Sequence, residues 1–240
     1  MKNVIVSLFL IASPVLSFGD AHLSHTKINA VEPLNSSVWE PAIELSESIW
    51  ENIRQDAGFL RKEVLQRAVK GYRLLAETGK MIEGKPLTLI DFDLPSTEKR
   101  LWIIDMETKT LRHVSLVAHG RNSGDLHATS FSNVPESYMS SLGFYLTGEK
   151  YMGKHGVSLR LDGLEKGIND KARDRAIVIH PADYATEAFL ESYGRLGRSL
   201  GCPALPPEHV EEVIELIQDQ SCLYIHADQS HYHEKSVFAS

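Results

Sequence analysis

The residues best suited to chemistry are a cysteine in a glycine-containing loop and a histidine that precedes it in the chain. Cys202 lies between a glycine and a proline in the segment 197–203, which is typical of a loop. His180 ends the apolar run 176–179, which predicts a buried strand. An imidazole draws a thiol toward the reactive thiolate, so the two residues could form a nucleophile and its base. Gly201 permits close backbone approach, so the N–H of Cys202 could point at a substrate carbonyl oxygen.

Composition narrows the possible functions. The chain has 240 residues, of which 42% are hydrophobic and 24% charged, as in an ordinary globular protein of one large domain or one domain with an appendage. Its formal net charge is −7 and it has no long basic run, which argues against a nucleic-acid partner.

The N-terminus has the pattern of a secretory signal peptide over residues 1–21. Lys2 precedes an apolar stretch over 4–16, and small residues follow at Ser17, Gly19 and Ala21. A membrane anchor is the alternative, but this stretch is shorter than the roughly 20 apolar residues that span a bilayer. We therefore expect a periplasmic or secreted protein with no transmembrane anchor after cleavage.

An exported chain with two cysteines could form a disulfide, which is the alternative interpretation of Cys202. The other cysteine, Cys222, lies in the apolar segment 221–226, which predicts a strand. There it would be a buried, inert side chain. The different surroundings of the two cysteines favour one reactive and one structural residue.

The remaining pattern predicts an α+β fold in which a helical N-terminal segment packs on a mostly antiparallel, β-rich domain. Residues 22–42 are polar and predict a linker or surface arm, and 43–80 have helical periodicity ending near Gly79. The domain over 81–240 contains short predicted strands at 87–93, 100–106, 111–118, 143–147, 157–161 and 176–180 and around Leu223, and a helix that begins at Pro206–Pro207.

Several motifs over residues 87–226 resemble those of the murein L,D-transpeptidase catalytic domain family. That family places a histidine before a Ser/Thr-x-Gly-Cys loop, matched here by His180 and Ser199–Cys202. The further matching segments are Asp91–Arg100, Val117–Gly120, Phe131–Asn133, Ser140–Tyr145, Gly153–Gly156, Ser158–Glu165 and Gly194–Ser199.

The resemblance implies a cysteine acyltransferase that acts on peptidoglycan stem peptides. Cys202 would attack the carbonyl after the third stem residue and release D-alanine, while His180 transfers the proton. The backbone amides of Gly201 and Cys202 would hold the oxyanion, and Ser199 would support the loop. No metal or organic cofactor is implied. Carbapenems would acylate the cysteine.

Two positions depart from the wider family pattern. Leu200 stands where that pattern has a histidine, and Ala204 stands where it has an arginine or asparagine. Neither side chain can hydrogen-bond or bind a carboxylate. Arg198, Arg195 and Arg160 are the candidates to supply these roles.

Four more residues are candidates for contact with the substrate. His155 lies in a glycine-rich loop and His119 at a predicted strand end, although a structural histidine is an equal interpretation of His119. Ser141 and Tyr145 could line the substrate channel, although turn chemistry explains the serine equally well.

Charged residues in two predicted strands have structural interpretations. Arg160 is more typical of a structural ion pair with Asp162. Asp91 and Asp93 are more typical of surface or turn-bonding groups than of a catalytic carboxylate pair.

Other functions stay open at this stage. Transfer of the acyl group to water instead of an amine would make the protein an L,D-carboxypeptidase. A non-catalytic wall-binding domain could keep the fold. A metal-binding module is suggested by the terminal His226, Asp228, His231 and His233, although their spacing fits no closed zinc site and the tail is expected to be mobile.

Overall fold

Two helices precede the sheet along the chain, as predicted. The computed structural model describes residues 36–239, so the predicted signal peptide lies outside the described residues. Helix α1 spans Ser36–Ile53 and α2 spans Lys62–Glu77. Helix α1 therefore begins inside the segment 22–42 that the sequence predicts as a linker, and it contains Pro41, whose missing N–H removes one intrahelical hydrogen bond.

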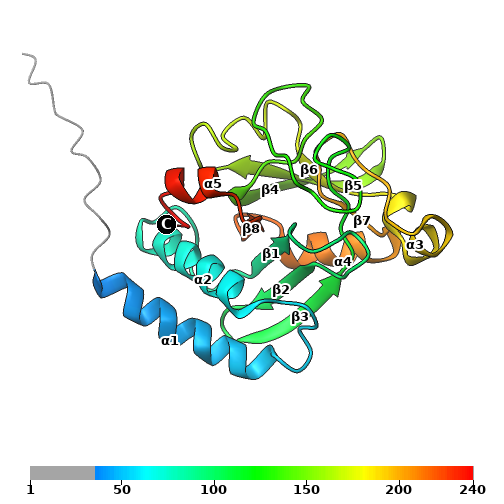
Figure 1. The fold of residues 1–240 in the computed structure, drawn as a ribbon. Coiled ribbons are helices and arrows are strands. Elements are labelled where there is room, and N and C mark those ends of the chain that lie inside the picture. The colour runs from blue at the N-terminus through cyan, green and yellow to red at the C-terminus, as the bar shows by residue number, and fades with distance from the viewer. Residues whose placement is uncertain (1–35, 240) are drawn as a thin grey trace, which may run out of the picture. The chain divides into compact units, whose positions relative to one another are not determined.

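The sheet has eight strands in the order β3-β2-β1-β8-β4-β5-β6-β7. Neighbouring strands are antiparallel except for the pairs β1–β8 and β6–β7. The bounds are β1 Leu87–Asp91, β2 Leu101–Asp105, β3 Thr110–Ser115, β4 Gly143–Gly153, β5 Gly156–Gly163, β6 Val178–Pro181, β7 Ala204–Leu205 and β8 Cys222–His226. This α+β architecture is the predicted one, and Figure 1 shows the arrangement of its elements.

The helical segment packs on the half of the sheet that is remote from β6 and β7. Helix α1 contacts β3, and α2 contacts β1 and β8. Helix α2 approaches the sheet at Gly71, where an added Cβ would lie 2.1 Å from the buried Phe144 ring. The glycine therefore allows a helix–sheet distance that no side chain would permit.

A buried ion cluster joins this helical segment to the sheet. Arg61, just before α2, donates to both carboxylate oxygens of Asp91 at 2.9 Å and to Asp93 at 2.7 Å. Asp91 is fully buried, so its prediction as a surface group was wrong. The Asp93 N–H also donates to Asp91 Oδ1 at 3.1 Å, which is the turn bond that was the other part of that prediction.

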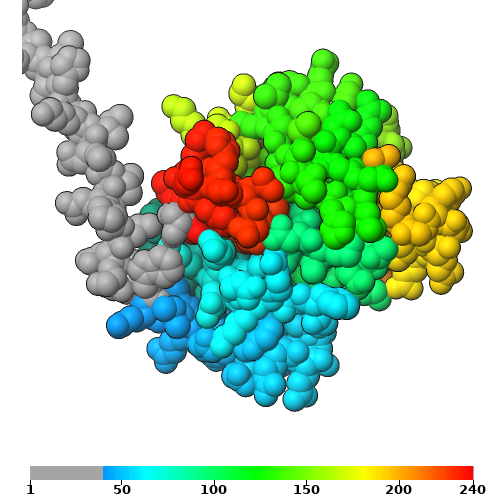
Figure 2. Space-filling model, in the orientation of Figure 1, coloured from blue at the N-terminus to red at the C-terminus, as the bar shows by residue number. Residues whose placement is uncertain are grey.

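The C-terminal residues fold back onto the domain instead of forming a free tail. Helix α5, Ser230–Lys235, buries Tyr232, and Phe238 follows it into the core with its ring centroid 5.6 Å from that of Phe144. Figure 2 shows this red segment filling the surface between the cyan α2 and the green loops. The expectation of a mobile tail was wrong because its aromatic side chains have apolar partners.

Three further helical elements complete the fold. The 3₁₀-turn η1 spans Asp183–Ala185, α3 spans Glu187–Tyr193 and α4 spans Pro207–Ile217. Helix α4 begins at the predicted Pro206–Pro207 and contacts β5 and β6. None of the helices that the structure describes is long and apolar enough to cross a membrane.

Glu165 generates a prediction about stability. Burial raises the pKa of this carboxyl to about 7, although Ser236, the Phe144 N–H and Tyr232 hydrogen-bond to it and lower the value. Because the folded-state pKa lies above the ordinary 4.5, the fold favours the protonated form. The contribution of Glu165 to the free energy of unfolding is fully present below about pH 4.5. It is lost as pH rises through about 7, by on the order of 3 kcal/mol.

We expect Glu165→Gln to remove this pH dependence, because glutamine keeps an acceptor for Ser236 and Tyr232 and does not ionise. Denaturant unfolding of both proteins between pH 4.5 and 8.5 measures the difference. Glu234→Gln, at an exposed glutamate of α5, is the control. Parallel curves for the wild type and Glu165→Gln would contradict the assignment.

Candidate active site

Backbone contacts and two hydrogen bonds fix the conformation of the loop that carries Cys202. Gly201 has φ 122°, and a Cβ there would lie 2.7 Å from the carbonyl oxygen of Met139. Ser199 Oγ accepts the N–H of Gly201 at 3.0 Å and donates to the carbonyl oxygen of Cys202 at 2.6 Å. These two bonds close the turn before the thiol.

The thiol of Cys202 lies against the backbone that leads into β6. The N–H of Val178 donates to Sγ over 3.5 Å, and Sγ lies 3.6 Å from the carbonyl oxygen of Ala176, to which the S–H can donate. Burial raises the pKa of this thiol, whereas the Val178 N–H and the nearby Arg175 charge lower it. The resting thiol is therefore protonated at neutral pH.

A strained turn positions this backbone. Ala176 has φ 53°, in the left-handed region that disfavours a side chain by about 1–2 kcal/mol. Its N–H donates to Arg173 O at 3.0 Å, and the Ile177 N–H donates to Ala172 O at 2.9 Å. This is the Schellman pattern that ends a helical turn. The turn directs the Ala176 carbonyl toward the thiol.

His180 lies in β6, two residues after Val178. It pairs with Ala204 of β7 in parallel register, and its N–H donates to Pro203 O at 3.4 Å. Cys202 comes two residues before Ala204, in the bend that leads into β7, so this pairing brings the cysteine loop next to the strand that carries His180.

The hydrogen bonds of His180 define its tautomer. Nδ1 lies 2.9 Å from the carbonyl oxygen of Pro181, which can only accept, so Nδ1 carries the proton and Nε2 has a free lone pair. Burial lowers the pKa of His180; the Pro181 carbonyl opposes that shift and His155 adds to it. A neutral imidazole with Nε2 available is the form that a general base requires.

The oxyanion donors differ from the sequence-based expectation. The N–H of Gly201 is engaged by Ser199 Oγ, so it is not available as the expectation required. The N–H of Cys202 has no acceptor among the described residues. Cys202 is therefore the loop residue whose amide can receive an oxyanion.

A cavity of about 560 Å³ adjoins His180. Its lining includes His155, Asp183, Tyr184 and Glu211. His155, in the β4–β5 turn, has its ring centroid 5.2 Å from that of His180, so the structure brings this predicted residue to the site. Tyr184 was missed by the sequence analysis, since it lies in a 3₁₀-turn without a motif. Burial, together with the Cys202 charge, raises the pKa of Tyr184 to about 12, so its hydroxyl remains a donor.

Three of the predicted substrate contacts are buried elsewhere. His119 is fully buried, with its Nδ1 2.8 Å from Arg100 Nη2, and burial lowers the pKa of His119 to about 3. It is therefore a neutral structural histidine. Tyr145 and Ser141 are also buried and hydrogen-bond to each other at 2.9 Å, so neither is accessible to a substrate.

The three predicted arginines form ion pairs with acidic residues of the chain. Arg160 pairs with Glu149 at 2.8 Å, and not with Asp162 as expected. Arg195 and Arg198 both pair with Asp125, at 2.9 and 3.1 Å. None of the three lines the cavity beside His180.

Leu200 is 58% exposed next to the nucleophile, and Ala204 is buried. Neither position supplies a charge, as the sequence indicates. A positive charge next to the cysteine loop comes from Arg175, whose Nη2 lies 3.4 Å from the Cβ position of Gly201 and which the sequence analysis missed.

The two cysteines are both free and have different surroundings. Cys222 is fully buried in β8, where burial raises the pKa of its thiol far above the ordinary range. The disulfide alternative is absent from the structure.

The structure does not gather the terminal histidines around one point. Among the described residues, the ligand-type side chains close enough to share one ion are Asp91, Asp93 and His226. Arg61 already donates to both aspartates, so its guanidinium neutralises the charge that a metal ion would otherwise neutralise. His231 is exposed and lies outside this cluster.

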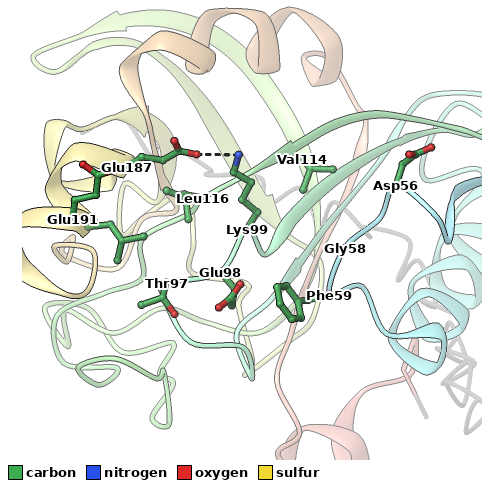
Figure 3. Close-up of a pocket in the computed structure, with 11 residues that line it drawn as sticks. Asp56, Gly58, Phe59, Thr97, Glu98, Lys99, Val114, Leu116, Glu187 and Glu191 are labelled. Carbon is green, nitrogen blue, oxygen red and sulfur yellow. Dashed lines mark ion pairs between the residues drawn. The ribbon is translucent and has the colours of Figure 1, made fainter.

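A second cavity, of about 520 Å³, lies between the α1–α2 connection and α3. Figure 3 shows Phe59 on one side and the Lys99–Glu187 ion pair, at 2.9 Å, on the other. Its lining contains no cysteine or histidine, so it cannot hold a thiol–imidazole pair.

Comparison with known proteins identifies a family. The profile of the L,D-transpeptidase catalytic domain matches residues 56–226. No curated protein matches the chain.

Solved structures share only a distant likeness. An L,D-transpeptidase from Stackebrandtia nassauensis is 12% identical over 77% of each chain, with a TM-score of 0.38. One from Mycobacterium tuberculosis is 13% identical over 59% of this chain and 57% of that one (TM-score 0.39), and one from Mycobacterium smegmatis is 12% identical over 60% and 59% (TM-score 0.36). The chain thus spans under two thirds of the mycobacterial structures.

The site predicts a sharp difference between the two thiols. In the native protein, iodoacetamide should alkylate Cys202 alone, and Cys222 only after unfolding. The rate at Cys202 should rise with pH to a midpoint above the ordinary value of 9.0, because burial disfavours the thiolate. Peptide mass mapping over pH 6–10.5 measures both. A plateau below pH 7 would instead indicate a preformed thiolate–imidazolium pair.

Proposed function

Because the chain belongs to the L,D-transpeptidase catalytic domain family, we propose that it is an exported peptidoglycan L,D-transpeptidase with Cys202 as nucleophile and His180 as base. One observation carries the assignment within this chain. The half-buried thiol accepts the N–H of Val178, two residues before a histidine of β6 whose Nε2 lone pair is available. Export rests on residues 1–21, which lie outside the described residues.

Acylation uses the geometry of the resting site. As Cys202 Sγ bonds to the carbonyl carbon after the third stem residue, its proton passes to His180 Nε2. The carbonyl oxygen becomes an oxyanion that the N–H of Cys202 can stabilise. The tetrahedral intermediate then collapses, the C–N bond breaks, and His180 returns the proton to the departing D-alanine amine. A thioester on Cys202 remains.

Transfer reverses these proton movements. An acceptor amine attacks the thioester carbon and gives its proton to His180, and the C–S bond breaks to regenerate the thiol. The cavity beside His180 could admit this acceptor, because Asp183 and Glu211 at its wall attract an ammonium group. Attack by water instead would give the L,D-carboxypeptidase reaction.

The decisive assay is incubation with a wall fragment bearing a stem tetrapeptide, followed by mass analysis of the products. The proposal predicts a crosslinked dimer and free D-alanine. A shortened tripeptide without dimer would identify the carboxypeptidase instead. An unchanged substrate, with folded protein, would contradict both.

The nucleophile is tested by a matched pair of variants. Cys202→Ala should reduce turnover by at least about a thousandfold while leaving the fold unchanged, because no other described thiol is accessible. Cys222→Ala removes the buried thiol and should keep turnover within a few fold. Persistent turnover in Cys202→Ala would move the nucleophile elsewhere.

A further inference from the structure

Arg175 places a guanidinium beside the turn that carries the nucleophile. It lies just before the strained Ala176 and is half-buried. Its Nη2 is 3.4 Å from the position that a Cβ on Gly201 would occupy. The side chain therefore reaches the residue directly before Cys202 from the opposite side of the loop.

The hydrogen bonds of Arg175 hold the guanidinium in this place. Nη1 donates to Ser132 O at 2.7 Å and to Ser141 Oγ at 3.3 Å. Nη2 donates to Met139 O at 2.6 Å and to Ser137 Oγ at 3.2 Å. Four of the five N–H donors of an arginine are thus engaged by neutral acceptors.

Two consequences follow from this bonding. Only the Nε–H of Arg175 has no hydrogen-bond acceptor among the described residues. Arg175 therefore cannot bind a substrate carboxylate through two parallel hydrogen bonds. Since no carboxylate among the described residues pairs with it, its positive charge is not neutralised. By contrast, Arg195 and Arg198, which precede Cys202 in the same loop, are both paired with Asp125.

We propose that Arg175 is a positioning residue that supplies the fixed positive charge at the Cys202 thiol and holds the loop 132–141 against Gly201. The proposal rests on the proposed function for its role in turnover, but the coupling of charge to thiol can be measured without substrate. A cation beside the loop that carries a thiol favours the thiolate over the thiol. It also favours the negative charge that develops on the attacked carbonyl oxygen.

The same residue connects two loops. The Arg175 bonds fix residues 132–141, from which Met139 O contacts the Gly201 turn and Ser140 Oγ donates to Gly201 O at 3.2 Å. Loss of the guanidinium would thus alter both charge and loop position. The test must separate these two effects.

Two variants separate them. Arg175→Lys and Arg175→Gln both lose the planar fork, but only lysine keeps the charge. In the iodoacetamide assay we expect the midpoint of Cys202 in Arg175→Gln to lie about one pH unit above that in Arg175→Lys. Ser137→Ala, which removes one loop bond and no charge, should keep the wild-type midpoint. Equal midpoints in the lysine and glutamine variants would overturn the proposal.

A second measurement needs no Arg175 variant. In wild-type protein with labelled arginine, the Arg175 side-chain NMR resonances should shift at the pH where Cys202 titrates, and this shift should vanish in Cys202→Ala. A shift that persists in Cys202→Ala, or no shift at all, would overturn the proposal even if neither Arg175 variant folds. Failure of the tetrapeptide assay alone would remove the proposed function and leave this coupling intact.

Discussion

The close approach of the Gly201 backbone to the Met139 carbonyl is the constraint on which the site depends. It lets the cysteine loop lie flat against the backbone that enters β6, so the thiol meets the Val178 N–H and the Ala176 carbonyl. Any side chain at position 201 would push the loop away. The parallel pairing of β6 with the short β7 then brings the cysteine loop next to the strand that carries His180.

The electrostatics of the site favour neutral partners before substrate binds. Burial disfavours both the thiolate of Cys202 and the imidazolium of His180, so the pair rests as thiol and imidazole. In the proposed mechanism, proton transfer would accompany attack on the carbonyl, when the Cys202 N–H can stabilise the new negative charge. A neutral thiol is also less prone to oxidation than a thiolate.

Local patterns predicted much of this fold, and the pair Cys202 and His180 remains a prediction from the sequence. The alternating strands and the Pro206–Pro207 helix start were confirmed because they depend on neighbours in sequence. The two-residue β7 and the burial of Asp91 depend on partners far along the chain, which no local pattern reveals. His119 and Tyr145 lie in motifs that suggest a site. Only the structure shows that they are buried and hydrogen-bonded to Arg100 and Ser141. Arg175, beside Gly201, and Tyr184, in the cavity beside His180, lie in turns that carry no motif.

The most direct test of the account is covalent trapping of the nucleophile by a carbapenem, whose strained cyclic amide can acylate an activated thiol. Intact-protein and peptide mass spectrometry should show one adduct, on Cys202, that forms much more slowly when His180 is replaced by glutamine. No adduct on a properly folded protein, or an adduct on another residue, would contradict the assignment of a thiol activated by the histidine of β6.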